Sequence, residues 1–375
     1  MRRGKREARR HGGDGGHGED GGHGEDQNGL CDLPSLRVSV FPRSPSVSVV
    51  ATVRNEGAAV ERLLDSLAAQ TRPPDEVVIV DGGSTDDTLA RLRRAADSGR
   101  LPLRVLERPG ANISAGRNVA VAAARGPIIA GTDAGVRLDP GWLAELVAPF
   151  AGPDPPDVVS GFFVPDPQST FELALAATTL PARRDVRPQG FLPSSRSIAY
   201  CKAAWVAVGG YPEWLDYCED LVFDLRLRQA GCRFAFAPGA VAAFRPRPSL
   251  GAFFRQYYRY ARGDGKADLW RRRHAVRYGT YLVVAPALAA LAIVNSPWWA
   301  LGYLLGAAIM FATPYRRLAG LWAEAGPAER LAALVWVPLI RVTGDVAKML
   351  GYPVGWAWRL RRRGRPELRW RVERA

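Results

Sequence analysis

The chain has 375 residues, enough for one catalytic domain of ordinary size together with smaller appendages. Its 51 lysines and arginines outnumber its 37 acidic residues, and the resulting formal charge of +14 suggests nucleic acid, a membrane surface or an anionic substrate as partner. The four cysteines have no paired spacing, which argues against a disulfide framework or a zinc site and favours reduced thiols in the cytosol.

Residues 1–45 differ in composition from the rest of the chain. A basic start is followed by a repeat of GGHGED, a composition that buries too little apolar surface to become ordered. Metal binding by His11, His17 and His23 is an alternative interpretation of this tract. We expect a disordered tail, and no apolar segment of signal-peptide length suggests export.

From Ser46 onward, strand and helix patterns alternate. Short apolar runs predict strands at 47–53, 77–81, 103–106 and 127–130. Helical spacing of apolar residues predicts helices over 60–67, 89–96 and 112–124 and another that begins near Pro140. Ser84 and Asp87 have the spacing of a capping box at the start of the second helix. Such alternation with short turns predicts a parallel sheet with helices on both sides.

Polar side chains follow three of these strands. Thr52, Arg54, Asn55 and Glu56 end the first, Asp81 ends the second, and Asp133 ends the fourth. A single acid at a strand end is often only a turn former. In a parallel sheet, however, these ends open on one edge, where such folds bind ligands. The convergence favours a binding site at that edge.

The motifs over residues 46–262 resemble those of glycosyltransferase family 2. They are VVATVRNEG, IVDGGSTDDT, NISAGRNVA, TDAG and CEDLVFDLRLRQAG, in this order along the chain. The resemblance implies an α/β GT-A fold, which is a mostly parallel sheet flanked by helices that binds a nucleotide-diphosphate sugar. Here a C-terminal helical membrane region would follow it.

The resemblance also implies a donor site. Thr52, Arg54 and Glu56 would lie against the nucleoside, and Asp81 would accept a hydrogen bond from the base. Asn112 and Arg117 would lie near the diphosphate, where the planar fork of an arginine suits phosphate oxygens. The alternative for Arg117 is a solvated arginine on a helix surface.

Asp133 matches the first acid of the family's Asp-x-Asp motif, which holds a divalent cation against the diphosphate. Mg²⁺ or Mn²⁺ suits such oxygen ligands. This sequence departs from the pattern because Gly135 stands where the second acid would be, and Asp139 is too far along to replace it. Metal dependence is expected, with weak affinity until the donor brings its phosphates.

Glu219 and Asp220 match the acidic pair on the acceptor side of the family's site. The resemblance makes Asp220 the general base for direct, inverting attack, although acids also favour a first helical turn for electrostatic reasons. Residues 194–196 and 209–211 resemble the lining of the acceptor pocket. In the segment 256–263, Arg259 or Arg262 would contact the diphosphate or, alternatively, lie beside a membrane.

No charged side chain occurs between Arg277 and Arg316. Two apolar runs, 278–294 and 297–313, are each about 17 residues or about 26 Å of helix, near the lower limit for spanning a bilayer. Arginines flank only the outer ends, so the catalytic domain is expected to be cytosolic. Residues 331–340 are interpreted as re-entrant or interfacial, and the arginine-rich C-terminus as lying on anionic lipid.

Together these features predict a tail over 1–45, a catalytic domain over 46–262 and a membrane-anchoring region over 263–375. The expected function is an inverting, metal-dependent glycosyltransferase, multi-pass in the plasma membrane, that transfers to a lipid-linked or cell-surface glycan. Three alternatives remain: a polyisoprenyl-phosphate sugar synthase, a catalytically silent membrane scaffold, and nucleic-acid binding by the basic C-terminus, the last without any accompanying motif.

Overall fold

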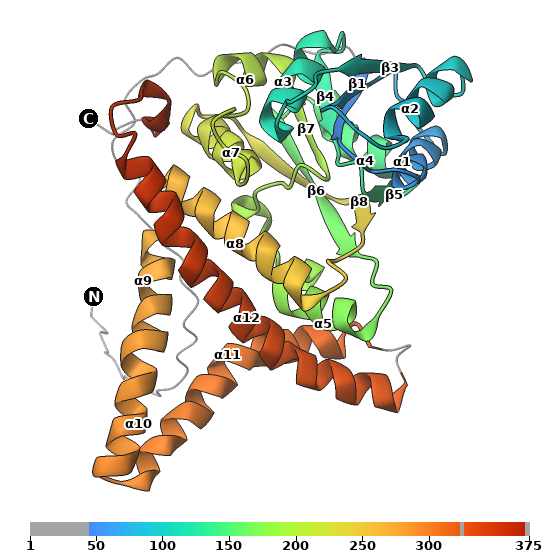
Figure 1. Ribbon diagram of the computed structural model, residues 1–375. Helices are drawn as coiled ribbons and strands as arrows, with labels where there is room; N and C mark the ends of the chain where they lie inside the picture. Colours follow the sequence, from blue (N-terminus) through green and yellow to red (C-terminus); the bar gives the residue numbers. More distant parts are fainter. Residues whose placement is uncertain (1–44, 323–325, 372–375) are drawn as a thin grey trace, which may run out of the picture. The chain divides into compact units, whose positions relative to one another are not determined.

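The computed structural model describes residues 45–322 and 326–371. Apart from Pro45, the tail expected over residues 1–45 lies outside the described residues. The described strands form one 8-stranded sheet in the order β3-β2-β1-β4-β7-β6-β8-β5. Helices flank this sheet, and further helices follow it in the chain (Figure 1).

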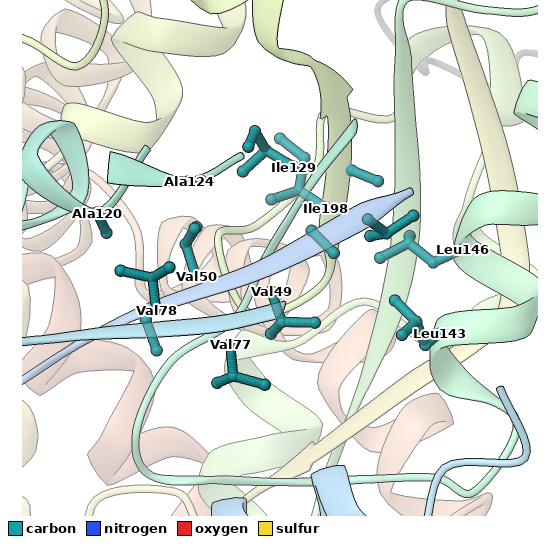
Figure 2. Close-up of a cluster of buried hydrophobic side chains, with 14 of the residues drawn as sticks. Val49, Val50, Val77, Val78, Ala120, Ala124, Ile129, Leu143, Leu146 and Ile198 are labelled. Atoms are coloured by element: carbon teal, nitrogen blue, oxygen red, sulfur yellow. The ribbon is translucent and has the colours of Figure 1, made fainter. Parts of the chain in front are cut away.

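The first half of the sheet is parallel and alternates with helices, as predicted. Its strands are β1 (Val47–Val53), β2 (Glu76–Asp81), β3 (Leu103–Glu107) and β4 (Ile128–Gly131). The helices between them are α1 (Ala59–Ala68), α2 (Thr88–Asp97) and α3 (Ile113–Ala123). Figure 2 shows how valines of β1 and β2 pack with residues of β4, β7, α3 and α4 in the core. Burial on both faces explains why the parallel strands are continuous apolar runs.

The capping box predicted at Ser84 and Asp87 is wrong. Helix α2 begins at Thr88, and the side chain of Asp87 makes no capping hydrogen bond. The Ser84 hydroxyl instead donates back to the Asp81 carboxylate, at 2.5 Å. The turn allows this because Gly83 has a φ of +93°, a conformation that favours glycine.

The second half of the sheet is mixed. Strand β7 (Ile198–Cys201) is antiparallel to both β4 and β6 (Val158–Pro165), whereas β8 (Phe234–Phe244) is parallel to β6. The edge strand β5 (Val136–Leu138) is antiparallel to β8. The helices here are α4 (Trp142–Val147), α5 (Thr170–Thr179), α6 (Lys202–Ala207) and α7 (Glu219–Gln229). The predicted fold class, an α/β fold with a mostly parallel sheet, is confirmed.

Two long helices, α8 (Leu250–Ala267) and α12 (Pro327–Leu360), cross in close contact (Figure 1). A Cβ added to Gly355 of α12 would lie 2.0 Å from the carbonyl oxygen of Arg262 on α8. Glycine therefore sets the separation of the two backbones. Helix α8 also runs across the predicted domain boundary at residue 262, which stays a prediction.

Residues 331–340 do not form the short separate segment that was predicted, and their interfacial position stays a prediction. These residues belong to α12, which continues for 34 residues. The charges that were expected to end the segment are accommodated in the helix, because Asp345 pairs with Arg277 at 2.6 Å and with Arg341 at 3.5 Å.

One helical stretch in the described part of the chain, Arg271–Val294, is long and apolar enough to cross a membrane by length and composition, and its apolar window is not buried. It consists of α9 (Arg271–Gly279), a π-helical turn (Thr280–Val284) and α10 (Ala285–Val294). The following helix, α11 (Leu301–Ala319), contains Pro314 and ends in Arg316 and Arg317. The second predicted span, and with it the multi-pass arrangement, is not supported.

Candidate active site

Two adjoining cavities lie where the parallel strands end. The strand-end cavity has a volume of about 500 Å³, and its lining includes Thr52, Glu56 and Gly135. The helical cavity has a volume of about 530 Å³, and its lining includes Glu219, Asp220 and Lys348. The two share seven lining residues: Ile113, Asp133, Arg196, Arg247, Gln256, Tyr257 and Tyr260.

Asp133 follows β4 and faces both cavities. Its side chain is 30% exposed, and its two carboxylate oxygens lie 2.8 Å from Nη2 of Arg117 and 3.7 Å from Nε of Arg196. Arg196 also stacks on the ring of Phe244, with its guanidinium carbon 4.4 Å from the ring centroid. The acid at the end of β4 is thus held by two cations and keeps an open side.

Arg117 of α3 joins Asp133 to the acidic pair on α7. Its second terminal nitrogen lies 2.7 Å from Oε1 of Glu219, and the side chain is only 6% exposed. The interpretation of Arg117 as a solvated surface residue is therefore wrong. Its predicted contact with a diphosphate stays a prediction, because both arms of the guanidinium are here occupied by carboxylates.

Glu219 and Asp220 begin α7, directly after Cys218, whose φ of +65° turns the chain into the helix. Burial and the neighbouring charge of Asp220 raise the pKa of Glu219 to about 7, with Arg117 opposing the shift. Asp220 is less buried; it accepts a hydrogen bond from the backbone N–H of Leu221 at 2.8 Å and lines the helical cavity. The pair thus has a buried acid that holds Arg117 and an accessible acid that faces the cavity.

Asp81 is not among the residues that line these two cavities. It is buried, and its carboxylate accepts hydrogen bonds from the backbone N–H groups of Gly83 and Ser84, at 3.2 and 3.0 Å. The structure brings Asp133 and Asp220 to one cavity, whereas the oxygens of Asp81 close the turn after β2. The hydrogen bond expected from the donor base to Asp81 stays a prediction.

Of the other predicted donor residues, some line the strand-end cavity and others do not. Thr52 and Glu56 line the strand-end cavity, and burial and the charge of Asp133 raise the pKa of Glu56. Arg54 is exposed and is not in either lining. Asn112 caps α3 by accepting from the Ala115 N–H at 2.9 Å, and its amide donates to the Glu213 carbonyl at 2.7 Å.

Several residues of the site were missed by the sequence analysis. Arg247, Asp264, His274 and Lys348 line the helical cavity but belong to no recognised motif. Asn118 fixes the loop at residues 209–211, because its amide group bonds to both the N–H and the carbonyl of Tyr211. A further residue, Arg196, was noted only as part of the segment 194–196. Arg259 and Arg262 pair instead with Tyr217 and Asp216.

A divalent cation fits this site only if the donor supplies most of its ligands. No group of three or more histidines, cysteines or acids in the described ranges could hold a metal ion by itself. Asp133 offers one partly exposed carboxylate, and a Cβ added to the adjacent Gly135 would meet nothing within 4 Å. Mg²⁺ is commonly held in this way, by one or two carboxylates together with substrate phosphates.

Comparisons with known proteins agree with this geometry. A sequence profile of "Glycosyl transferase family 2" matches residues 48–208. The succinoglycan biosynthesis protein ExoA of Rhizobium meliloti (strain 1021) is 31% identical over 308 residues, which cover 74% of this chain and 90% of that protein. The O-antigen chain rhamnosyltransferase RfbN of Salmonella typhimurium (strain LT2) is 24% identical over 225 residues, 56% of this chain and 70% of that protein.

Among solved structures, the mannosyltransferase PcManGT from Pyrobaculum calidifontis, in complex with GDP-Man and Mn²⁺, superposes with a TM-score of 0.51 at 22% identity. The match covers 86% of this chain and 90% of that one, and it shows a shared fold. The profile, the relatives and the fold agree with the motifs and with the acids at the strand ends. The chain belongs to glycosyltransferase family 2 and is a glycosyltransferase.

Proposed function

We propose that the protein is an inverting glycosyltransferase that transfers a sugar from a nucleotide-diphosphate sugar to a lipid-linked or cell-surface glycan at the cytosolic face of the plasma membrane. One observation carries the proposal: Asp133 and Asp220 open on adjoining cavities, and the buried Arg117 joins their two elements. Donor and acceptor would then meet where the cavities join.

The strand-end cavity would hold the donor, with the nucleoside near Thr52 and Glu56 and the diphosphate near Asp133. Arg196 and Arg247 line both cavities and add positive charge beside these phosphates. Asp133 would hold Mg²⁺ or Mn²⁺, which neutralises charge on the departing nucleoside diphosphate when it is bound. Asp81 would accept a hydrogen bond from the base, Asn112 would lie near the diphosphate, and Arg54 would lie beside the nucleoside. Asp81 and Asn112 also fix the turn after β2 and the start of α3.

The helical cavity would admit the acceptor. Asp220 would remove the proton of the attacking hydroxyl while that oxygen bonds to the anomeric carbon and the bond from this carbon to the phosphate oxygen breaks. Glu219 would act as a positioning residue, because its carboxylate contacts Arg117, which in turn holds Asp133.

Anchoring by Arg271–Val294 would place both cavities beside the membrane. Side chains of this stretch are strongly exposed, for example Val283 at 64% and Ile293 at 85%. Arg271, Arg272 and Arg273 stand at its start, and the next arginines along the chain are Arg277 and Arg316. The positive-inside rule therefore favours a cytosolic catalytic domain.

The decisive experiment is transfer and donor hydrolysis by the full chain in detergent, with and without Mn²⁺. We expect Asp220→Asn to lower kcat by roughly 10²- to 10⁴-fold, the usual contribution of a general base, while nucleotide-sugar affinity is kept. Asp97→Asn, at an exposed position at the end of α2, is the matched control and should be unaffected.

Two outcomes would favour the alternatives. A wild-type protein that neither binds nor turns over any common nucleotide sugar would favour a catalytically silent scaffold, which Gly135 in place of the second acid would explain. Glycosylation of a polyisoprenyl phosphate that carries no sugar would favour a polyisoprenyl-phosphate sugar synthase. Product analysis with the two kinds of lipid acceptor separates these cases.

A further inference from the structure

We propose that Arg273 and Lys348, at the α9 end of the helical cavity, bind the phosphate or diphosphate group of an amphiphilic acceptor whose apolar chain lies along α9 and α10. This inference rests on the proposed function and deepens it by naming the acceptor class. The argument starts from the charges that line the cavity.

Lys348 of α12 lines the cavity without an ion-pair partner among the described residues. Its ammonium lies 4.9 Å from the centroid of the Tyr257 ring. The nearby acid Asp345 is already paired with Arg277 and Arg341. Burial lowers the pKa of Lys348 to about 8, so the charged form is held at a cost that a bound anion would offset.

The other acid at this end, Asp264 of α8, is also engaged. One of its carboxylate oxygens lies 3.2 Å from Nε2 of the buried His274, and the other accepts from the Cys218 thiol at 3.5 Å. Positive charge at this end of the cavity therefore exceeds the negative charge available to pair with it.

Arg273 adds a second cation at the mouth. Its guanidinium carbon lies 4.3 Å from the ring centroid of Trp270, and the described residues include no carboxylate at ion-pair distance from it. The same turn of helix begins the apolar stretch Arg271–Val294, which has exposed large apolar side chains at 276, 282–284, 291, 293 and 294. An anion site that continues into an apolar helix surface suits a phosphorylated lipid better than a free phosphate.

This subsite is distinct from the place proposed for the donor diphosphate. The charges that act on Lys348 are those of Arg277, Asp345, Arg341 and Asp264. Those that act on Arg196, beside the donor, are of Asp133, Tyr260 and Asp220. The helical cavity therefore has cations near Arg196 and near Lys348, and Asp220 lines the same cavity. This arrangement suits an acceptor whose lipid phosphate binds at Lys348 while its sugar hydroxyl reaches Asp220.

The test is binding of farnesyl diphosphate, a short prenyl diphosphate, to the full chain in detergent. Saturating uridine and guanosine diphosphates keep the probe out of the donor site. Since a hydrogen-bonded charge pair contributes about 1.5–3 kcal/mol, we expect Lys348→Met and Arg273→Gln each to weaken binding about 10- to 100-fold. Arg272→Gln, one residue away, exposed and outside the cavity lining, is the matched control and should bind normally.

Further measurements test three points: the role of the lysine charge, the need for both lipid and phosphate in the ligand, and the effect of the substitution on stability. Unchanged binding by Lys348→Met would overturn the proposal, as would farnesol or inorganic pyrophosphate binding as tightly as farnesyl diphosphate. A Tm of Lys348→Met equal to or above that of the wild type supports a ligand role, whereas a lower Tm with unchanged binding identifies a structural lysine. If the protein turns over the donor but farnesyl diphosphate binding does not depend on Lys348 and Arg273, the proposed function stands and only the lipid-phosphate subsite is rejected.

Discussion

At the scale of single residues, the site depends on how carboxylates and arginines are paired. Arg117 holds Asp133 with one arm and Glu219 with the other, although Glu219 lies 102 positions further along the chain. Because a buried cation between two acids fixes both, the residue that follows β4 is tied to the start of α7. Such a pairing follows from the fold and has no signature in local sequence.

Glu219 is expected to make stability depend on pH. Its pKa of about 7 in the folded state exceeds the ordinary value of 4.5, so between these values the folded protein retains a proton that the unfolded chain has lost. The free energy of unfolding should therefore fall as pH rises from about 4.5 to 7. Glu219→Gln should remove this fall.

The measurement is Tm between pH 5 and pH 8 for wild type and variant. Glu61→Gln, which changes a surface glutamate paired with Arg91, should keep the wild-type pH dependence. A Glu219→Gln protein whose Tm varies with pH as steeply as that of the wild type would show that Glu219 titrates in its ordinary range.

Gly135→Asp should strengthen cation binding, because it restores the missing acid of the Asp-x-Asp pattern at a position that lines the strand-end cavity. A Cβ here meets no atom within 4 Å, so the new side chain can enter without displacing its neighbours. Since affinity for hard cations rises with the number of charged oxygen ligands, we expect half-maximal activity at a roughly tenfold lower Mn²⁺ concentration.

Gly141→Asp is the matched control, because this glycine also has open space but does not line the cavity. It adds the same charge on the other side of β5, directly before α4, and should leave the Mn²⁺ dependence unchanged. Equal Mn²⁺ dependence in wild type and Gly135→Asp would place the cation elsewhere.

The motifs predicted where the acids Asp133 and Asp220 lie. They did not predict which groups the acidic side chains contact. Thr52 lies at the end of β1, Glu56 and Asp133 follow strands, and Asp220 lies in the first turn of a helix. Their places could therefore be inferred from the alternating pattern. Asp81 has the same sequence context as Asp133, yet its oxygens accept from its own glycine turn. Local pattern does not distinguish an acid that faces a ligand from one that closes a turn.

At the scale of elements, the crossing of α8 and α12 shapes the helical cavity, because α8 contributes Tyr257, Tyr260 and Asp264 and α12 contributes Lys348. This crossing was not predicted. Arg341 and Asp345 interrupt the apolar pattern of α12 and resemble the end of a short segment, but their charges are paired within the fold. Strand β2 was predicted most directly, because burial on both faces leaves the unbroken β-branched run Val77–Val80.

Gly355→Ala should disturb this crossing. The added methyl would lie 2.0 Å from the Arg262 carbonyl oxygen, which is a backbone atom, so the two helices must move apart. Overpacking of this kind costs about 1–3 kcal/mol, which thermal unfolding of the full chain would detect as a lower Tm. Gly306→Ala on α11 meets nothing within 4 Å, so it should keep or raise the Tm through its better helix propensity. A Gly355→Ala protein as stable as the wild type would show that the helices are not held at this separation.

At the scale of the whole molecule, positive charge and exposed apolar surface occur together. The chain carries a net charge of +14, and three consecutive arginines begin the stretch Arg271–Val294, whose apolar window contains no buried residue. An exposed apolar surface of this length is unfavourable in water, and its basic flank suits anionic headgroups. These properties of the stretch Arg271–Val294 support the membrane anchoring proposed above.

Val283→Lys tests this partner directly. Val283 lies near the middle of the stretch and is 64% exposed, so a lysine there would cost the folded protein in water little but would have to enter the bilayer. At about 3 kcal/mol for a charge near the centre of a spanning helix, partitioning into anionic vesicles should fall roughly 100-fold.

Val206→Lys, which changes a valine that is 62% exposed on α6, adds the same charge to the catalytic domain and should leave vesicle binding intact. Donor hydrolysis in detergent should be the same for both variants, because neither residue lines the cavities. If Val283→Lys floats with vesicles as well as the wild type does, the stretch Arg271–Val294 does not enter the bilayer, and its exposed surface must be covered by protein.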